Sequence, residues 1–217
     1  MSVGLARVAV LLSGRGSNLV ALADACVRGE VPAEIALVLS NKADAGGLDR
    51  ARERGIPTVA IPSKGMPREE HESRLIAALD GIDARWVCLA GYMRLLTPVF
   101  INRYAPRIVN IHPALLPSFP GVDAQAQAWE YGVRVSGCTV HLVDAGCDTG
   151  PIVLQRTVPV LGDDTADTLA HRILEQEHIA YPTALRMLLT RRWHVHGRRV
   201  VFDPLIDGDG PQPASTS

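Results

Sequence analysis

The sequence of 217 residues has little excess charge of either sign and no long hydrophobic run. It contains 22 Lys and Arg residues against 23 Asp and Glu residues, so it lacks the basic excess that is typical of nucleic-acid-binding proteins. No apolar stretch approaches the roughly 20 residues that span a bilayer. The amino-terminal segment does not resemble a signal peptide, because Arg7 precedes only a short apolar run. We therefore expect small-molecule partners, and neither a nucleic acid nor a membrane.

Cysteine is also scarce, and its spacing excludes the common zinc and redox motifs. The four cysteines stand at positions 26, 88, 138 and 147 without a C-x-x-C pair, which is typical of reduced thiols in a cytoplasmic protein. The Asp and His residues of segment 141–148 do not form three converging ligands, so we expect no metal. A chain of this length buries about 70% of its surface without needing disulfides. We expect a single domain over 1–203 and a disordered tail over 204–217, where Gly, Pro, Asp and Ser prevail.

Short apolar runs alternate with helical patterns along most of the chain. Such runs are typical of buried parallel strands, whereas the polar alternation after residue 137 favours antiparallel ones. The sequence therefore predicts an α/β, Rossmann-like fold: a mostly parallel twisted sheet with helices on both faces and antiparallel additions near the carboxyl terminus. The expected strands are 8–12, 35–39, 58–61, 86–90, 108–111, 138–143, 152–158, 193–196 and 199–202. The expected helices are 19–28, 47–54, 68–79, 98–104, 123–131 and 163–189, the last with Asp164 or Thr165 as its N-cap.

A glycine-rich segment, Ser13-Gly-Arg-Gly-Ser-Asn18, follows the first expected strand and opens a helix. Glycines permit a sharp turn, and the free N–H groups at a helix start attract anions such as phosphate. The segment lacks the third glycine of a dinucleotide fingerprint, because Leu19 stands there, and it lacks the Gly-Lys-Ser/Thr of a triphosphate loop. Two interpretations stay open: a phosphate site, or a tight turn capped by Ser17 or Asn18.

Two later segments carry groups that can move protons. Asn110 and His112 are two residues apart at the end of a strand, so their side chains share one side; Asn can donate to an oxyanion, and His can transfer a proton. The segment from His141 to Pro151 contains two carboxylates, Asp144 and Asp148. Two interpretations stay open: a carboxylate that is the partner of a histidine, or an Asx-type turn that uses Asp148. His194 and His196 lie in an expected exposed hairpin, and we assign them no role.

These segments together resemble the phosphoribosylglycinamide formyltransferases, folate-dependent enzymes of purine biosynthesis. The resemblance runs from about residue 7 to residue 203. It rests on Gly14-Arg-Gly-Ser-Asn-Leu19, Leu89-Ala-Gly-Tyr-Met-Arg-Leu-Leu96, Asn110-Ile-His-Pro113, Leu115-Leu-Pro-Ser-Phe-Pro-Gly121, Gly137-Cys-Thr-Val-His141, Asp148-Thr-Gly-Pro151, and Glu175-Gln-Glu-His178 with Tyr181-Pro182.

The resemblance implies a role for each matched residue. The part up to about residue 105 would bind the substrate phosphate, and the remainder would carry the catalytic and folate loops. The implied catalytic residues are Asn110, His112 and Asp148, with Asp148 keeping His112 charged. The implied substrate-binding residues are Gly16, Ser17, Asn18 and Glu177. The implied folate-binding residues are Arg68, Met93, Arg94, Leu95, Leu96, Asn110, Asp144, Ala145, Gly146, Cys147 and Asp148.

Two residues depart from the family pattern. Ala114 stands where the family often has Ser, and Leu174 stands near a position that is often polar. We therefore expect one hydroxyl contact to be missing and a second substrate contact from the last long helix to be in doubt.

The implied reaction is direct acyl transfer from 10-formyltetrahydrofolate to the amine of 5′-phosphoribosylglycinamide, without a covalent enzyme intermediate or a metal, in a monomer or homodimer. A formyltetrahydrofolate hydrolase is the main alternative, although such enzymes usually carry an extra amino-terminal domain and the first strand here begins at about Val8. A tRNA formyltransferase would usually add a carboxy-terminal nucleic-acid domain. A non-catalytic nucleotide-binding module would leave Asn110, His112 and Asp148 unexplained.

Overall fold

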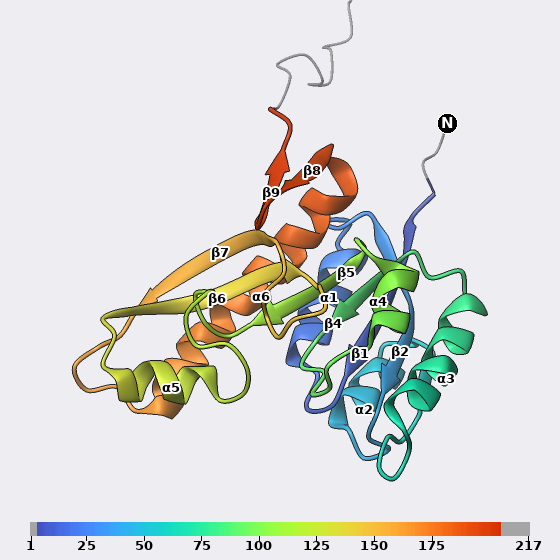
Figure 1. Ribbon diagram of the computed structural model, residues 1–217, viewed down its shortest axis with the longest axis horizontal. Helices are drawn as coiled ribbons and strands as arrows, with labels where there is room; N and C mark the ends of the chain where they lie inside the picture. Colours follow the sequence, from blue (N-terminus) through green and yellow to red (C-terminus); the bar gives the residue numbers. More distant parts are fainter. Residues whose placement is uncertain (1–3, 205–217) are drawn as a thin grey trace, which may run out of the picture.

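The computed structural model describes residues 4–204, and these form one nine-stranded sheet with helices packed on it (Figure 1). The strand order is β3-β2-β1-β4-β5-β6-β7-β9-β8. The strands are β1 (Ala6–Leu12), β2 (Ala33–Ser40), β3 (Thr58–Ala60), β4 (Trp86–Leu89), β5 (Ile108–His112), β6 (Val135–Leu142), β7 (Ile152–Pro159), β8 (Trp193–His196) and β9 (Arg199–Phe202). The helices are α1 (Ser17–Val27), α2 (Gly46–Arg52), α3 (Arg68–Asp80), α4 (Pro98–Tyr104), α5 (Ala124–Tyr131) and α6 (Ala166–Thr190).

The direction of the strands changes at β5. Strands β1 to β5 pair in parallel, and β6 and β7 then pair antiparallel. The predicted α/β fold with antiparallel additions is therefore confirmed. The last strands add a detail that the sequence pattern did not predict: β9 runs parallel to β7 through the pair Ile152 and Arg199, and β8 completes the hairpin at the sheet edge.

Both faces of the sheet are covered, which explains why the parallel strands are apolar throughout. In β1, Val8, Val10 and Leu12 face a core shared with α1, α2 and α6. Ala9 and Leu11 point to the opposite face and pack with residues of α3 and α4. Successive side chains of a strand alternate between faces, so a strand buried on both sides needs an unbroken hydrophobic run.

The two helices that position the site begin close to where the sequence predicted. Helix α1 starts at Ser17, two residues earlier than expected, because the turn at Gly16 already places the next residues in a helix. Helix α6 starts after Thr165, whose side chain accepts a hydrogen bond from the N–H of Thr168, so Thr165 is the N-cap. Residues 205–217, which include almost all of the predicted tail, lie outside the described residues.

None of the helices within residues 4–204 has the length and apolar character needed to cross a bilayer.

Candidate functional site

The predicted site residues gather at one edge of the sheet, where the parallel strands end. Strand β1 leads into the glycine segment, β2 into Lys42, and β4 into Gly91. Strand β5 ends with Asn110 and His112. Strand β1 lies between β2 and β4. The chain adds strands on one side of β1 up to β3 and then continues on the other side with β4, so the strand order reverses beside β1. Open α/β sheets bind their ligands at such a switch point.

The glycine segment leaves the start of α1 open to a ligand. Gly16 is the N-cap of α1 with φ 76°, a left-handed conformation that favours glycine. A Cβ at Gly16 would also lie 2.6 Å from Cα of Gly47, so the close approach of α2 requires glycine too. No side chain caps α1, and the predicted cap by Ser17 or Asn18 is therefore wrong. The first N–H groups of α1 remain available to an anion.

Asn18 and Glu177 connect this helix start to α6. The amide Nδ2 of Asn18 donates to Oε2 of Glu177 at 2.6 Å, and both side chains are buried. Burial raises the pKa of Glu177, an effect that the hydrogen bond from Asn18 partly offsets. Glu177 thus engages one of the two N–H bonds of the Asn18 side-chain amide. A contact from Asn18 to a phosphate would use the second N–H of this amide or the backbone N–H.

A cavity of about 650 Å³ opens beside the glycine segment and α6. It brings together Gly16, Ser17, Asn18 and Glu177, the four residues implied to bind substrate. The cavity is also lined by Ser13 and Arg15 of the glycine segment, and by four polar residues that stand in no motif of the sequence, which are Lys42, Gln125, Asp167 and His171. These four residues come from three different segments and carry no local signal, because only the fold places them around one space.

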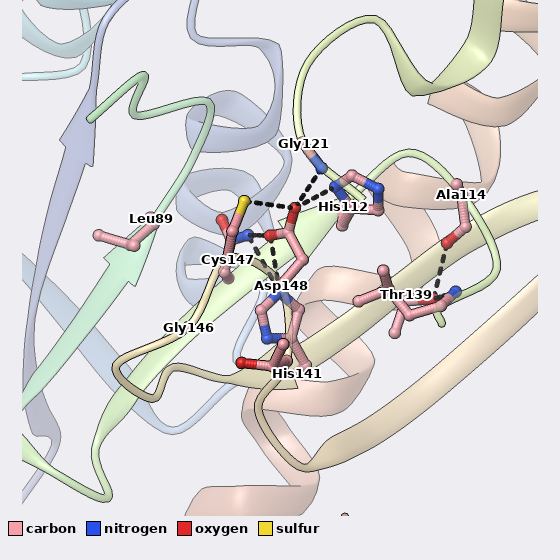
Figure 2. A network of polar contacts seen from close by, with 12 residues as sticks. Leu89, His112, Ala114, Gly121, Thr139, His141, Gly146, Cys147 and Asp148 are labelled. Carbon is pink, nitrogen blue, oxygen red and sulfur yellow. Dashed lines mark hydrogen bonds and ion pairs between the residues drawn. The ribbon is translucent and has the colours of Figure 1, made fainter. Parts of the chain in front are cut away.

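The second part of the site is centred on the Asp148 carboxylate (Figure 2). Its Oδ2 lies 3.3 Å from Nδ1 of His112 and accepts the N–H of Gly121 at 2.8 Å. Its Oδ1 accepts a long hydrogen bond of 3.4 Å from Nδ2 of Asn110. The structure therefore brings the three predicted catalytic residues, Asn110, His112 and Asp148, into one contact group.

The charge state of this group differs from the one we expected. Burial alone would raise the pKa of Asp148, but the contact with His141, the hydrogen bond from Gly121 and the nearby His112 lower it to about 2, so the carboxylate is ionised at neutral pH. Burial lowers the pKa of His112, and Asp148 and the Phe119 carbonyl offset this only in part. The prediction that Asp148 raises the pKa of His112 above its ordinary value is therefore wrong, because desolvation of the ring outweighs the attraction.

His112 is nevertheless surrounded by acceptors. Its Nε2 lies 2.8 Å from the carbonyl oxygen of Phe119, and its Nδ1 faces Asp148. A ring with protons on both nitrogens can donate to both partners, whereas a neutral ring can donate to only one. Burial thus favours the neutral ring before the reaction. The Phe119 carbonyl and the Asp148 carboxylate are placed to accept from both nitrogens once the ring is protonated.

His141 also belongs to the group around Asp148, although the sequence assigned it no role. Its Nδ1 lies 2.9 Å from the carbonyl oxygen of Leu142 and donates to it, so Nε2 can accept the 3.1 Å hydrogen bond from Nδ2 of Asn110. The same Nε2 lies 3.5 Å from Oδ1 of Asp148. His141 faces Asn110 because β5 and β6 pair antiparallel with these two residues opposite each other. The sequence alone does not give this register, so it could not show that His141 belongs to the site.

The loop 144–148 is folded by Asp144 rather than by Asp148. Oδ1 of Asp144 accepts the N–H of Gly146 at 3.1 Å and the hydroxyl of Thr149 at 2.6 Å. The interpretation of Asp148 as the residue of an Asx-type turn is therefore wrong, and the Asp148 carboxylate faces His112 instead. Within the loop, Ala145, Gly146 and Cys147 are exposed, and the thiol of Cys147 lies 3.6 Å from Oδ2 of Asp148.

The other implied folate residues differ in exposure. Met93 and Leu95 are exposed, Arg94 is half-buried, and Leu96 is buried in the core beside α3 and α4. Arg68 is exposed at the first residue of α3. Met93 also lines the cavity. Its N–H donates to Oγ of Ser13 at 2.9 Å, and this bond joins the glycine segment to the segment that follows β4.

The two departures from the family pattern have different surroundings. Ala114 is fully buried, and its carbonyl oxygen accepts the hydroxyl of Thr139 at 2.7 Å (Figure 2), so the backbone anchors this loop without a side-chain hydroxyl. Leu174 lines the cavity as an apolar residue among polar ones. The exposed His194 and His196 lie on β8. In the described chain, no group of three or more His, Cys, Asp or Glu residues is arranged to hold a metal ion.

The fold and the two parts of the site are those of a one-carbon group transferase. Residues 6–185 match the family described as formyl transferase, and the chain belongs to that family.

Its relatives are more specific in name. The chain is 43% identical over 197 residues to phosphoribosylglycinamide formyltransferase of Escherichia coli, covering 90% of this chain and 93% of that protein. It is 50% identical over 186 residues to the trifunctional purine biosynthetic protein adenosine-3 of Drosophila pseudoobscura, but it spans only 14% of that relative's length.

Two solved structures show the range of similar proteins. Glycinamide ribonucleotide transformylase 1 from Symbiobacterium toebii is 46% identical, with a TM-score of 0.90 over 93% of this chain and 95% of that one. A formyltetrahydrofolate deformylase from Pseudomonas syringae is 29% identical, with a TM-score of 0.86 over 93% of this chain and 67% of that one. The fold is therefore shared by proteins named as a transformylase and as a deformylase.

Proposed function

We propose that the chain transfers the formyl group of 10-formyltetrahydrofolate to the amine of 5′-phosphoribosylglycinamide, giving formylglycinamide ribonucleotide and tetrahydrofolate. One observation carries the proposal: the cavity at the start of α1 and the Asp148 group lie at the same sheet edge, with only β4 between β1, which leads into the cavity, and β5, which carries Asn110 and His112. Such an arrangement suits an acceptor with a phosphate at one end and a nucleophile at the other.

The acceptor would lie along the cavity. The open N–H groups of α1 at Ser17 and Asn18, beyond the Gly16 turn, would bind the phosphate, since a helix start carries partial positive charge. Glu177 would accept hydrogen bonds from the ribose or the glycinamide. The bond from Asn18 holds the Glu177 carboxyl in place for this role.

The donor would lie against the other side of the Asp148 group. The exposed apolar side chains of Met93 and Leu95 offer a surface for the flat pterin ring, and the exposed loop 144–148 would close over it. Arg68 and Arg94 would meet the acidic tail of the folate. Leu96 supports this segment from the core rather than forming its surface.

In the reaction, the acceptor amine forms a bond to the formyl carbon, and the bond from that carbon to the folate nitrogen then breaks. The tetrahedral intermediate carries negative charge on its oxygen, which an amide N–H of Asn110 would stabilise. Both N–H bonds of this amide are engaged by His141 and Asp148, so the 3.4 Å contact with Asp148 is the one to be exchanged for the formyl oxygen.

His112 would carry the proton in this sequence. Neutral at rest, it takes the proton that the attacking amine loses and gives it to the departing folate nitrogen. The ionised Asp148 stabilises the intervening imidazolium from 3.3 Å. The proton ends on tetrahydrofolate, and no covalent bond forms to the protein.

Hydrolysis of 10-formyltetrahydrofolate is the second candidate, because the deformylase of similar fold makes water a possible acceptor. The test follows deformylation of 10-formyltetrahydrofolate with and without phosphoribosylglycinamide, and analyses the products. Turnover that requires the acceptor and yields its formyl derivative supports the transferase. Equal turnover without the acceptor, with free formate as the product, supports the hydrolase.

We propose further that the protein acts in the cytoplasm as a monomer or homodimer, as a single domain over 1–203, with these small molecules as its partners. Sedimentation of the purified full chain at several concentrations distinguishes the two oligomeric states.

A further inference from the structure

The cavity beside the glycine segment is lined by groups of both charges. Arg15 and Lys42, both exposed, line it together with the open start of α1. Helix α6 contributes five lining residues, which are Asp167, Ala170, His171, Leu174 and Glu177. A phosphate bound at the start of α1 therefore has two cations in the same cavity, and its contact with α6 depends on which of these five residues it faces.

Four of the five α6 residues are poorly suited to contact a phosphate. Glu177 and Asp167 are carboxyl residues, and Glu177 is already bonded to Asn18. The side chains of Ala170 and Leu174 offer no hydrogen bond. His171 remains, since imidazole donates a hydrogen bond when neutral and carries a positive charge when protonated. Among the described residues, its ring takes part in none of the hydrogen bonds or ion pairs, so it can turn to a ligand without losing a partner.

The position of His171 fits this role. It lies one helical turn from Leu174 and six residues before Glu177, which corresponds to about 9 Å along the helix axis. Glu177 marks the place where α6 touches Asn18 at the start of α1. The start of α1, His171 and Glu177 all line this one cavity, so a phosphate bound at the start of α1 shares the cavity with the imidazole of His171.

We propose that His171 is a specificity-determining residue that donates a hydrogen bond to the acceptor's phosphate, in the cavity that Arg15 and Lys42 also line, and so supplies the polar contact that Leu174 cannot make. This inference rests on the proposed function for the identity of the acceptor. The chemistry it requires, recognition of a phosphate monoester on a sugar, can be measured without formyl transfer.

The experiment measures binding of ribose 5-phosphate and of ribose by calorimetry to the full chain and to three variants. His171→Ala should weaken binding of ribose 5-phosphate roughly fivefold to tenfold, the loss expected for one hydrogen bond of ordinary strength at an exposed side chain. His171→Lys, which keeps a donor and a positive charge, should recover most of the affinity. His194→Ala removes an exposed histidine from β8, outside the cavity, and should leave binding unchanged.

Steady-state kinetics give a second readout. In His171→Ala the KM for phosphoribosylglycinamide should rise by the same factor, with kcat and the KM for the formyl donor unchanged. Ribose 5-phosphate binding that is equal in His171→Ala and the parent, or absent from both, overturns the role of His171. A parent chain that binds ribose 5-phosphate through His171 but transfers no formyl group would refute the proposed function and leave this contact standing.

Discussion

The Asp148 carboxylate is the group whose removal gives the most informative test of the mechanism. Asp148→Asn keeps the size and shape of the side chain but removes its negative charge. The change leaves Oδ1 in place to accept from Asn110, yet it takes away the charge that faces Nδ1 of His112 at 3.3 Å. The imidazolium that forms during proton transfer would then be buried without a counter-charge.

The expected magnitude follows from the distance. At 3.3 Å, the attraction between two unit charges is about 1 kcal/mol in bulk water and about 5 kcal/mol at the effective dielectric constant of a protein surface. Both side chains are mostly buried, with 4% of His112 and 13% of Asp148 exposed, so the true value lies between these limits. We expect kcat to fall by between about tenfold and a few thousandfold.

The assay has two readouts. Titration of His112 by NMR should show a pKa in Asp148→Asn that is lower than in the parent, because the attraction that partly offsets burial is gone. Turnover should fall and should not recover in more acid solution, since the formation of the imidazolium is then unfavourable at every pH. A pKa of His112 that is unchanged or higher in the variant would refute this account and leave Asp148 as a residue that only shapes the loop.

The same substitution also has a consequence for folding. The pKa of Asp148 is lowered from 3.8 to about 2, so the ionised carboxylate stabilises the native state above the unfolded pKa and loses that effect as the pH falls from 3.8 towards 2. Because solvent reaches part of the group, we expect on the order of 1–2 kcal/mol. Urea unfolding should show Asp148→Asn less stable than the parent at neutral pH, with the difference shrinking in acid. A difference that is the same at both pH values contradicts the assigned charge state.

Three further predictions concern single residues of the site. His112→Ala and Asn110→Ala should each lower kcat on the order of a hundredfold or more, and the double variant should lose less than the product of the two factors, because both groups act on one intermediate; near-normal turnover of His112→Ala would remove the proposed mechanism. Asn18→Ala breaks the 2.6 Å bond that positions Glu177, so it should raise the KM for phosphoribosylglycinamide, whereas an effect confined to the KM of the formyl donor would show that this region does not bind the acceptor. Gly16→Ala puts a Cβ at a left-handed residue and against Gly47, so urea unfolding should show a loss of about 1–3 kcal/mol, and unchanged stability would mean that the turn can relax.

Much of the fold was readable from local sequence patterns. The apolar runs of β1, β2 and β4 reflect burial on both faces, and this requirement acts residue by residue along each strand. Gly16 could be recognised as a turn residue because its left-handed backbone is a local property. The pairing of Asn110 with His112 as a catalytic candidate also rests on local spacing, since residues two apart on a strand share a side.

The composition of the site depended on contacts between distant segments. Asp148 meets His112 from 36 positions further along the chain, and His141 joins them through the antiparallel register of β5 and β6. The cavity collects Lys42, Gln125 and His171 from different segments, and none of these three residues stands in a recognisable motif.

The charge state was also decided by the tertiary structure. A carboxylate beside a histidine raises the pKa of the ring, and from the sequence that was the only effect that could be weighed. Folding adds the removal of water from His112, which acts in the opposite direction and is the larger effect. The sequence by itself thus determined which chemical groups are present and which strands carry them. The burial and spacing of those groups depend on how the whole chain packs, so the direction of the pKa shift and the membership of the site were decided only by the tertiary structure.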